Sequence, residues 1–164
     1  PASAQSASGP AQRLRLGRVS AARHIDRRFI ERTGAHEIRY HDEWRWTDQP
    51  DTFLTRALSR DLFERAGLVQ AFSGAAPTLD VELTALEQRS AGGGKRAYAS
   101  VLAALHDDRE QLWRKSFEIE TGVGSGDQAE ALADAMGKTL AQLCAQITQQ
   151  TVGTLNASSP APSD

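Results

Sequence analysis

The chain has 164 residues, of which 40% are apolar and 24% are charged, and its formal net charge is −2 at pH 7. This length and composition favour one domain around a single core, and no run approaches the roughly 18 apolar residues of a membrane-spanning helix. A single cysteine, Cys144, excludes an intramolecular disulfide and a multi-cysteine zinc site.

The charge is distributed unevenly along the chain. Residues 1–32 contain seven arginines against Asp26 and Glu31, so the front is basic and the remainder acidic. Such a stretch suits anionic lipid, an acidic protein or nucleic acid. Arginine alternates with leucine at 13–16, however, and this pattern favours the solvated face of a strand.

Both ends of the chain are rich in Ala, Ser and Pro. They contain too little apolar surface to offset the entropy lost on ordering. We therefore predict a flexible N-terminal linker at 1–12, a single domain at 13–152 and a flexible C-terminal tail at 153–164.

The first part of the domain predicts strands near 13–20, 28–33 and 37–46. The third strand has one apolar face, which we expect to be buried and which consists of Ile38, Tyr40, Trp44 and Trp46. A turn at Gly34-Ala35 precedes this strand, and we expect Gly34 to supply a positive φ there.

A helix is predicted over 51–66, directly after Pro50. The apolar period changes there from two to about 3.6, and Gly67 is a typical residue just past a helix end. We expect this helix to bury five large apolar side chains: Phe53, Leu54, Leu58, Leu62 and Phe63.

Residues 78–120 predict an antiparallel meander, and a long helix is expected over 127–150 with Asp127 at its start. The whole chain therefore predicts an α+β fold. It has a mixed or mostly antiparallel sheet of about five to six strands, with two helices packed on one face.

The sequence contains no convincing catalytic, cofactor or metal residues. The densest group of metal-ligating types, at 36–43, lies along one strand and does not converge as zinc requires. The glycines at 92–94 favour a hairpin turn, and those at 122–126 favour a connection to a capped helix. Trp44 and Trp46 lie opposite the arginines of their strand, which argues against nucleic-acid binding by stacking.

Four short motifs together carry a family resemblance. They are Leu-Arg-Leu-Gly-Arg-Val at 14–19, Ile-Asp-Arg at 25–27, Ile-Glu-Arg-Thr-Gly at 30–34, and Trp46 twelve positions before Leu58. In this order and spacing the chain resembles the ABC-type transport auxiliary lipoprotein family. Its best-known members are similar to the third component of paraquat-inducible intermembrane lipid-transport systems.

The resemblance implies a non-enzymatic, periplasmic lipoprotein of a Gram-negative bacterium, without a cofactor and anchored in the outer membrane by a lipid on an N-terminal cysteine. That cysteine is absent from this sequence, which fits removal of the first residues of a precursor. The implied partners are a periplasmic lipid carrier of the mammalian-cell-entry (MCE) type and an inner-membrane ABC transporter, with assembly into a homo-oligomer left open. We expect partner contacts at Arg32, Thr33, Gly34, Arg39 and Arg45.

Two alternatives remain open at this point. One is a protein-binding module resembling the amino-terminal domain of Tol-type periplasmic proteins, without a link to lipid transport. The other is a small hydrolase or metal-dependent enzyme built on histidines, of which the chain has four: His24, His36, His41 and His106.

Overall fold

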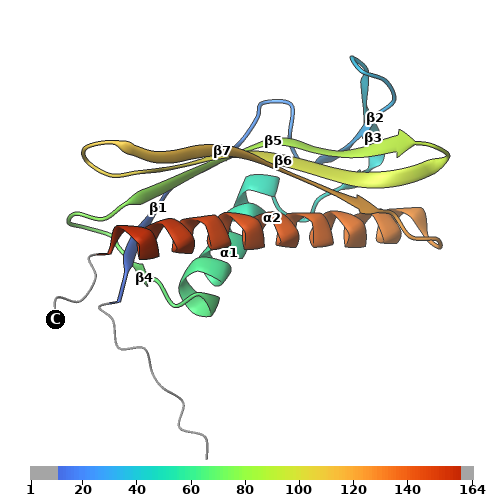
Figure 1. The fold of residues 1–164 in the computed structure, drawn as a ribbon. Coiled ribbons are helices and arrows are strands. Elements are labelled where there is room, and N and C mark those ends of the chain that lie inside the picture. Colours follow the sequence, from blue (N-terminus) through green and yellow to red (C-terminus); the bar gives the residue numbers. More distant parts are fainter. Residues whose placement is uncertain (1–10, 160–164) are drawn as a thin grey trace, which may run out of the picture.

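The computed structural model describes residues 11–159, and Figure 1 shows their arrangement. A seven-stranded sheet lies over two helices, as the predicted α+β class requires. The elements in chain order are β1 (Arg13–Ala21), β2 (Arg28–Arg32), β3 (Ile38–Arg45), α1 (Pro50–Ser59), the π-helical turn η1 (Arg60–Arg65), β4 (Val69–Gln70), β5 (Thr78–Ala91), β6 (Gly94–His106), β7 (Gln111–Gly122) and α2 (Gln128–Ser158).

The long strand β5 organises the sheet. On one side it pairs antiparallel with β6, and β6 pairs antiparallel with β7. On the other side it pairs in parallel with β1 along its first half and with β2 along its second half. β3 pairs antiparallel with β2, and β4 pairs in parallel with β1. The sheet is mixed because it contains both parallel and antiparallel pairs.

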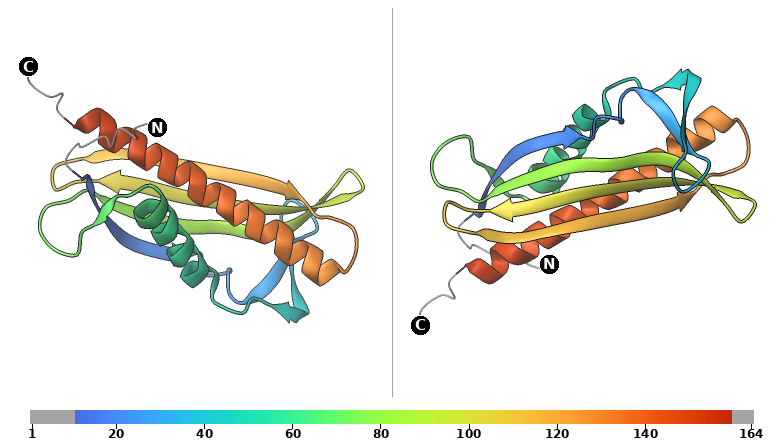
Figure 2. Two further views of the ribbon diagram at one scale, coloured as in Figure 1. Left: turned by 90° about the horizontal axis from the view of Figure 1, so that it is seen from below. Right: turned by 90° about the horizontal axis from the view of Figure 1, so that it is seen from above.

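Both helices cover the same face of the sheet (Figure 2). The buried side chains of α2 repeat at helical spacing and pack against the alternate side chains of β6 and β7 that point to this face. The largest fully buried side chains of the core are mostly leucines from both layers, namely Leu54, Leu58 and Leu62 from α1 and η1, Leu14, Leu79, Leu83 and Leu105 from the sheet, and Leu132, Leu140 and Leu143 from α2.

The first helical segment differs from its prediction. Helical structure does span the expected region, but its last six residues form a wider turn, in which the Ala66 N–H donates to the Asp61 carbonyl five residues back. Leu54, Leu58 and Leu62 are fully buried as expected. Phe53, in contrast, is 41% exposed, because the first turn of α1 lies at the rim of the core.

Three other expectations need correction. The sheet has seven strands rather than five to six, because residues 69–70 pair with β1. Gly34 does not have a positive φ. Helix α2 continues to Ser158, so residues 153–158 of the predicted tail are helical, with Leu155 buried against the core. The predicted domain limits otherwise stay predictions, and residues 1–10 and 160–164 lie outside the described residues.

The two ends of the described chain lie together. The Gln12 side chain donates to the Ser159 hydroxyl at 3.1 Å, and the β2–β3 hairpin lies at the opposite end of the molecule (Figures 1 and 2). Within residues 11–159, no helix combines the length and the apolar character that crossing a bilayer requires.

Candidate interaction surface

The open face of the sheet is the face that α1 and α2 leave uncovered (Figure 1). The strand register brings polar side chains to it in rows across β5, β6 and β7. One row contains Asp80, Ala104 and Arg114, and the next contains Glu82, Leu102 and Ser116. This face therefore mixes charges of both signs with small apolar patches.

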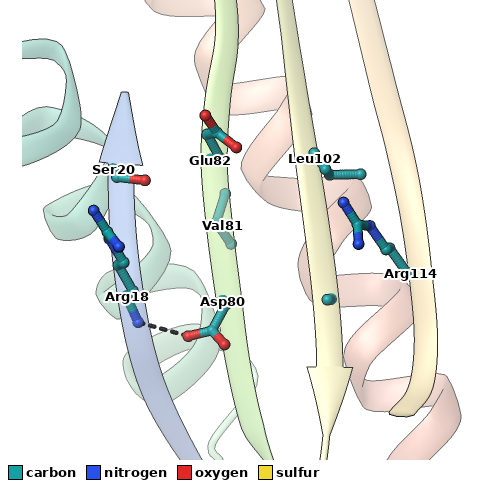
Figure 3. A pocket seen from close by; sticks show the side chains of 8 residues that line it. Arg18, Ser20, Asp80, Val81, Glu82, Leu102 and Arg114 are labelled. Carbon is teal, nitrogen blue, oxygen red and sulfur yellow. Dashed lines mark hydrogen bonds between the residues drawn. The ribbon is translucent and has the colours of Figure 1, made fainter. Parts of the chain in front are cut away.

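A first hollow, which we call the proximal hollow, lies on the open face toward the end that carries the chain termini. It has a volume of about 350 Å³. Figure 3 shows its side chains, which come from four neighbouring strands: Arg18 and Ser20 from β1, Asp80, Val81 and Glu82 from β5, Leu102 and Ala104 from β6, and Arg114 from β7.

The charges of the proximal hollow are only partly satisfied within the chain. Asp80 accepts a hydrogen bond from the Arg18 backbone N–H at 2.7 Å and pairs with His106 Nε2 at 2.8 Å. Among residues 11–159, the side chains of Arg18, Glu82 and Arg114 make neither a hydrogen bond nor an ion pair. Two cationic groups and one anionic group are thus available to a binding partner.

A second hollow, the distal hollow, lies at the other end of the open face and has a volume of about 510 Å³. It extends from the β2–β3 turn across β5 to β7. Its lining residues are Arg32, Thr33, Gly34, Ala35, Arg89, Ser90 and Glu120.

Glu87 forms the floor of this end of the sheet. Its carboxylate is buried and accepts from Arg32 Nε and Nη2 at 2.7 and 3.0 Å, and from Arg89 Nε at 2.7 Å. Burial acts to raise the pKa of Glu87, but the hydrogen bonds from the two arginines outweigh it, so that the pKa lies below its ordinary value. The carboxylate therefore fixes both guanidinium groups beside the distal hollow.

Arg89 has a second contact that orients it. Its guanidinium carbon lies 3.3 Å from the centroid of the Tyr98 ring. Because Glu87 carries one negative charge and its two arginine partners carry two positive charges, this cluster has a net charge of +1.

The structure brings together three of the five residues for which we predict partner contacts. Arg32, Thr33 and Gly34 all line the distal hollow. Arg39 lies on the outer strand β3, opposite Glu31, and Arg45 lies at the other end of β3, opposite Arg28. Glu87 and Arg89 were not predicted from the sequence, in which the signal for them is the loss of alternation around 84–88.

The histidines do not assemble a site. His24 accepts the Tyr40 hydroxyl through its backbone carbonyl, His41 stacks on Trp44, and His106 pairs with Asp80, while His36 is exposed. Among the residues that the structure describes, no three His, Cys, Asp or Glu side chains are placed to hold a metal ion.

The other candidate motifs have structural roles. Gly92 and Gly93 have φ angles of 56° and 81° and form the β5–β6 hairpin turn. The Asp127 carboxylate caps α2 by accepting from the Glu130 N–H at 3.1 Å. Burial raises the pKa of the Cys144 thiol to about 12, so its reactive thiolate form is strongly disfavoured.

Comparison with known proteins assigns the family. The profile of the ABC-type transport auxiliary lipoprotein component family matches residues 1–148. The chain belongs to this family. Comparison with curated protein sequences finds no match. The auxiliary lipoprotein family is associated with ABC transport systems, and its members are proteins of the bacterial envelope.

Solved structures with low sequence identity share the fold of this auxiliary lipoprotein. A Xanthomonas campestris protein is 23% identical, with a TM-score of 0.76 over 88% of this chain and 85% of its own. A Chlamydia trachomatis protein is 13% identical, with a TM-score of 0.63 over 90% and 99%. A minor lipoprotein from Acinetobacter baumannii is 12% identical, with a TM-score of 0.59 over 89% and 94%.

Proposed function

We propose that this protein is a non-enzymatic adaptor that tethers a lipid-transport system to the outer membrane of a Gram-negative bacterium. Its partners are an MCE-type periplasmic lipid carrier and, through that carrier, an inner-membrane ABC transporter. Family membership supports the link to transport. The single structural observation behind the adaptor role is a sheet face without helices, on which the side chains of Arg18, Glu82 and Arg114 in the proximal hollow lack partners among residues 11–159.

The arrangement of the molecule gives this tether a direction. β1 begins at the end opposite the β2–β3 hairpin (Figure 1). A lipid anchor on the amino-terminal side would hold that end at the membrane and direct the hairpin toward the periplasm. We propose that the distal hollow, with Arg32, Thr33 and Gly34, is where the lipid carrier binds, and that Arg39 and Arg45 extend the contact along β3.

The Glu87 cluster at the distal end favours an acidic group on the partner surface. It retains one excess positive charge, whereas on the neighbouring strand β3 the exposed Arg39 and Arg45 are balanced by the exposed Asp42 and Glu43. Rim charges of this kind raise association rates and set orientation more than they raise affinity. The contact should therefore weaken as salt is added.

Capture by the MCE-type carrier from detergent-solubilised native membranes tests the proposal. Gly34→Trp is a suitable test variant. A Cβ at Gly34 meets no atom within 4 Å, and the added ring would fill the distal hollow. We expect wild-type protein to be captured and Gly34→Trp to be captured at least tenfold less. Gly153→Trp, an exposed glycine near the opposite end, is the matched control and should be captured like the wild type.

Two results would count against the proposal in different ways. Absence of capture of the wild-type protein would overturn the tethering role. Equal capture of Gly34→Trp and wild type would exclude the distal hollow as the contact. The outer-membrane position is tested separately, by metabolic labelling with palmitate and sucrose-gradient separation of the two membranes, and recovery of the protein in the inner membrane would contradict it.

A further inference from the structure

An apolar pocket lies outside the open face, where the end of β3, the start of α1 and the first half of α2 meet. Its volume is about 410 Å³, which falls in the range of roughly 300–1,000 Å³ that is usual for small-molecule sites. Elements from both layers of the fold line it, so the pocket is formed by the packing of the domain rather than by one mobile loop.

The wall of the pocket is aromatic and its floor is aliphatic. Phe29 and Trp46 stack with ring centroids 4.5 Å apart and an interplanar angle of 14°. Leu86 from β5 and Leu140 from α2 supply the buried floor, and Phe53 stands at the mouth. The 41% exposure of Phe53 leaves aromatic surface in contact with water that a bound apolar group would cover.

The rim of the pocket carries positive charge. It contains Arg45, together with Arg56 and Asp48, which pair with each other. Among residues 11–159, the Arg45 guanidinium makes neither a hydrogen bond nor an ion pair. An apolar interior with one available cation at its edge fits a ligand that has a hydrocarbon body and an anionic end.

We propose that this pocket binds the acyl chain of an anionic amphiphile, a fatty acid or an anionic lipid, with its head group at Arg45. If a methylene needs about the 30 Å³ of a liquid water molecule, the pocket accommodates roughly a dozen methylenes. This site goes beyond the tethering role and does not depend on it, because the proposed carrier contact lies mainly on the open face.

A series of saturated carboxylates tests the proposal by calorimetry, with each probe below its micelle concentration. Each added methylene should tighten binding about fourfold until the pocket is full, near dodecanoate, and longer chains should gain little more. Non-specific adsorption would not stop at a fixed length. Dodecyltrimethylammonium, which has the same chain and a cationic head, should bind at least tenfold more weakly than dodecanoate.

Two variants separate the interior of the pocket from its rim. Ala133 is an exposed residue of α2 that lines the pocket, so Ala133→Trp should abolish dodecanoate binding. Ala141→Trp, at an exposed position further along α2, makes the same change outside the pocket and should bind like the wild type. Arg45→Glu should weaken dodecanoate binding at least tenfold. It should also reduce or reverse the preference of the pocket for dodecanoate over dodecyltrimethylammonium.

Absence of dodecanoate binding to the wild-type protein would overturn the proposal, as would equal binding by Ala133→Trp. If dodecanoate does not bind but Ala133→Trp abolishes capture by the carrier, the pocket receives a protein side chain and the acyl-chain assignment is wrong. Dodecanoate binding without carrier capture would support the pocket while contradicting the tethering role, so the two proposals can fail independently.

Discussion

Glu87 is the residue whose environment departs furthest from that of an ordinary surface carboxylate. It lies on the open face, yet Arg32 and Arg89 cover it, and the Arg89 guanidinium in turn stacks on Tyr98. A buried ion costs several kcal/mol of desolvation, which is offset here by three charge-assisted hydrogen bonds. The cluster joins β2 to β5 at the point where the two strands share only a short parallel pairing.

Glu87→Gln tests the strength of this cluster. The amide retains the shape of the carboxylate but leaves two guanidinium groups, each about one-third exposed, without their counter-ion. We expect the free energy of unfolding to fall by about 2 kcal/mol, measured by urea denaturation at pH 7. Glu120→Gln is the control on the same face, because its 3.5 Å pair with Arg96 is exposed, and it should change stability by less than about 0.5 kcal/mol. Equal effects of the two changes would contradict the role given to Glu87.

At the scale of elements, Gly17 decides how β1 lies against β5. The register between these strands shifts between Leu16 and Val19, which brings the β1 backbone close to β5 side chains. A Cβ at Gly17 would lie 2.3 Å from Asp80 Oδ1 and 2.6 Å from Thr78 Cγ2. The glycine of the Leu-Gly-x-Val motif is therefore explained by close approach and needs no unusual φ.

Gly17→Ala should consequently destabilise the protein by about 1 to 3 kcal/mol, because Asp80 must move and lose its hydrogen bond from Arg18. Urea denaturation of a double-mutant cycle with Asp80→Ala identifies the cause. In the Asp80→Ala background, Gly17→Ala should lower the free energy of unfolding by at least about 0.5 kcal/mol less than it does in the wild type. Additive effects would show that the clash with Asp80 is not the reason for the glycine.

The last two turns of α2 give a second test at this scale. Their composition led to the prediction of a flexible tail from residue 153, but Leu155 is buried. Leu155→Ala should lower the free energy of unfolding by about 2 to 3 kcal/mol. Asn156→Ala changes the next, exposed residue and should have an effect within about 0.5 kcal/mol. If Leu155→Ala had no effect, the tail interpretation would be correct after all.

The elements that could be predicted from the sequence are those in which apolar residues recur with a regular period. Alternation along β5 to β7 and the 3.6-residue period of α2 follow from burial of one face, and both are local patterns. β4 has only two residues, so it has no readable period, and its pairing with β1 depends on tertiary contacts. The end of α2 was missed because small residues dominate there, whereas Leu155 and Thr151 are buried by packing that composition does not report.

The candidate surface was predictable only where a motif marked it. Arg32, Thr33 and Gly34 belong to one contiguous turn, so the motif leads directly to the distal hollow. Glu87 and Arg89 are more than 50 positions away from Arg32 along the chain. The parallel register of β2 and β5 brings them beside Arg32, where both arginines donate to Glu87. Phe53 was expected in the core because helical spacing shows which face is apolar but does not show where the core ends.

For the molecule as a whole, the titration of several carboxylates determines how stability responds to acid. The Asp26 carboxylate is paired with Arg28, that of Glu87 with Arg32 and Arg89, and that of Asp107 accepts the backbone N–H groups of Glu110 and Arg109. These contacts place the pKa of each group below its ordinary value. Asp26 lies just before β2 and Asp107 lies in the β6–β7 turn, so the effect is not confined to β5.

The sign of the pH dependence follows from these lowered pKa values. The unfolded chain takes up protons at a higher pH than the folded chain does, so the stabilisation is complete above about pH 5 and is lost as the pH falls through the folded values. Urea denaturation at constant ionic strength should show equal stability at pH 7 and 5 and a steady loss below pH 4, to which Glu87 contributes no more than about 1.4 kcal/mol per pH unit. Glu87→Gln should reduce that slope, because its amide does not titrate. A stability that stayed constant or rose between pH 5 and pH 3 would contradict the assigned carboxylate contacts.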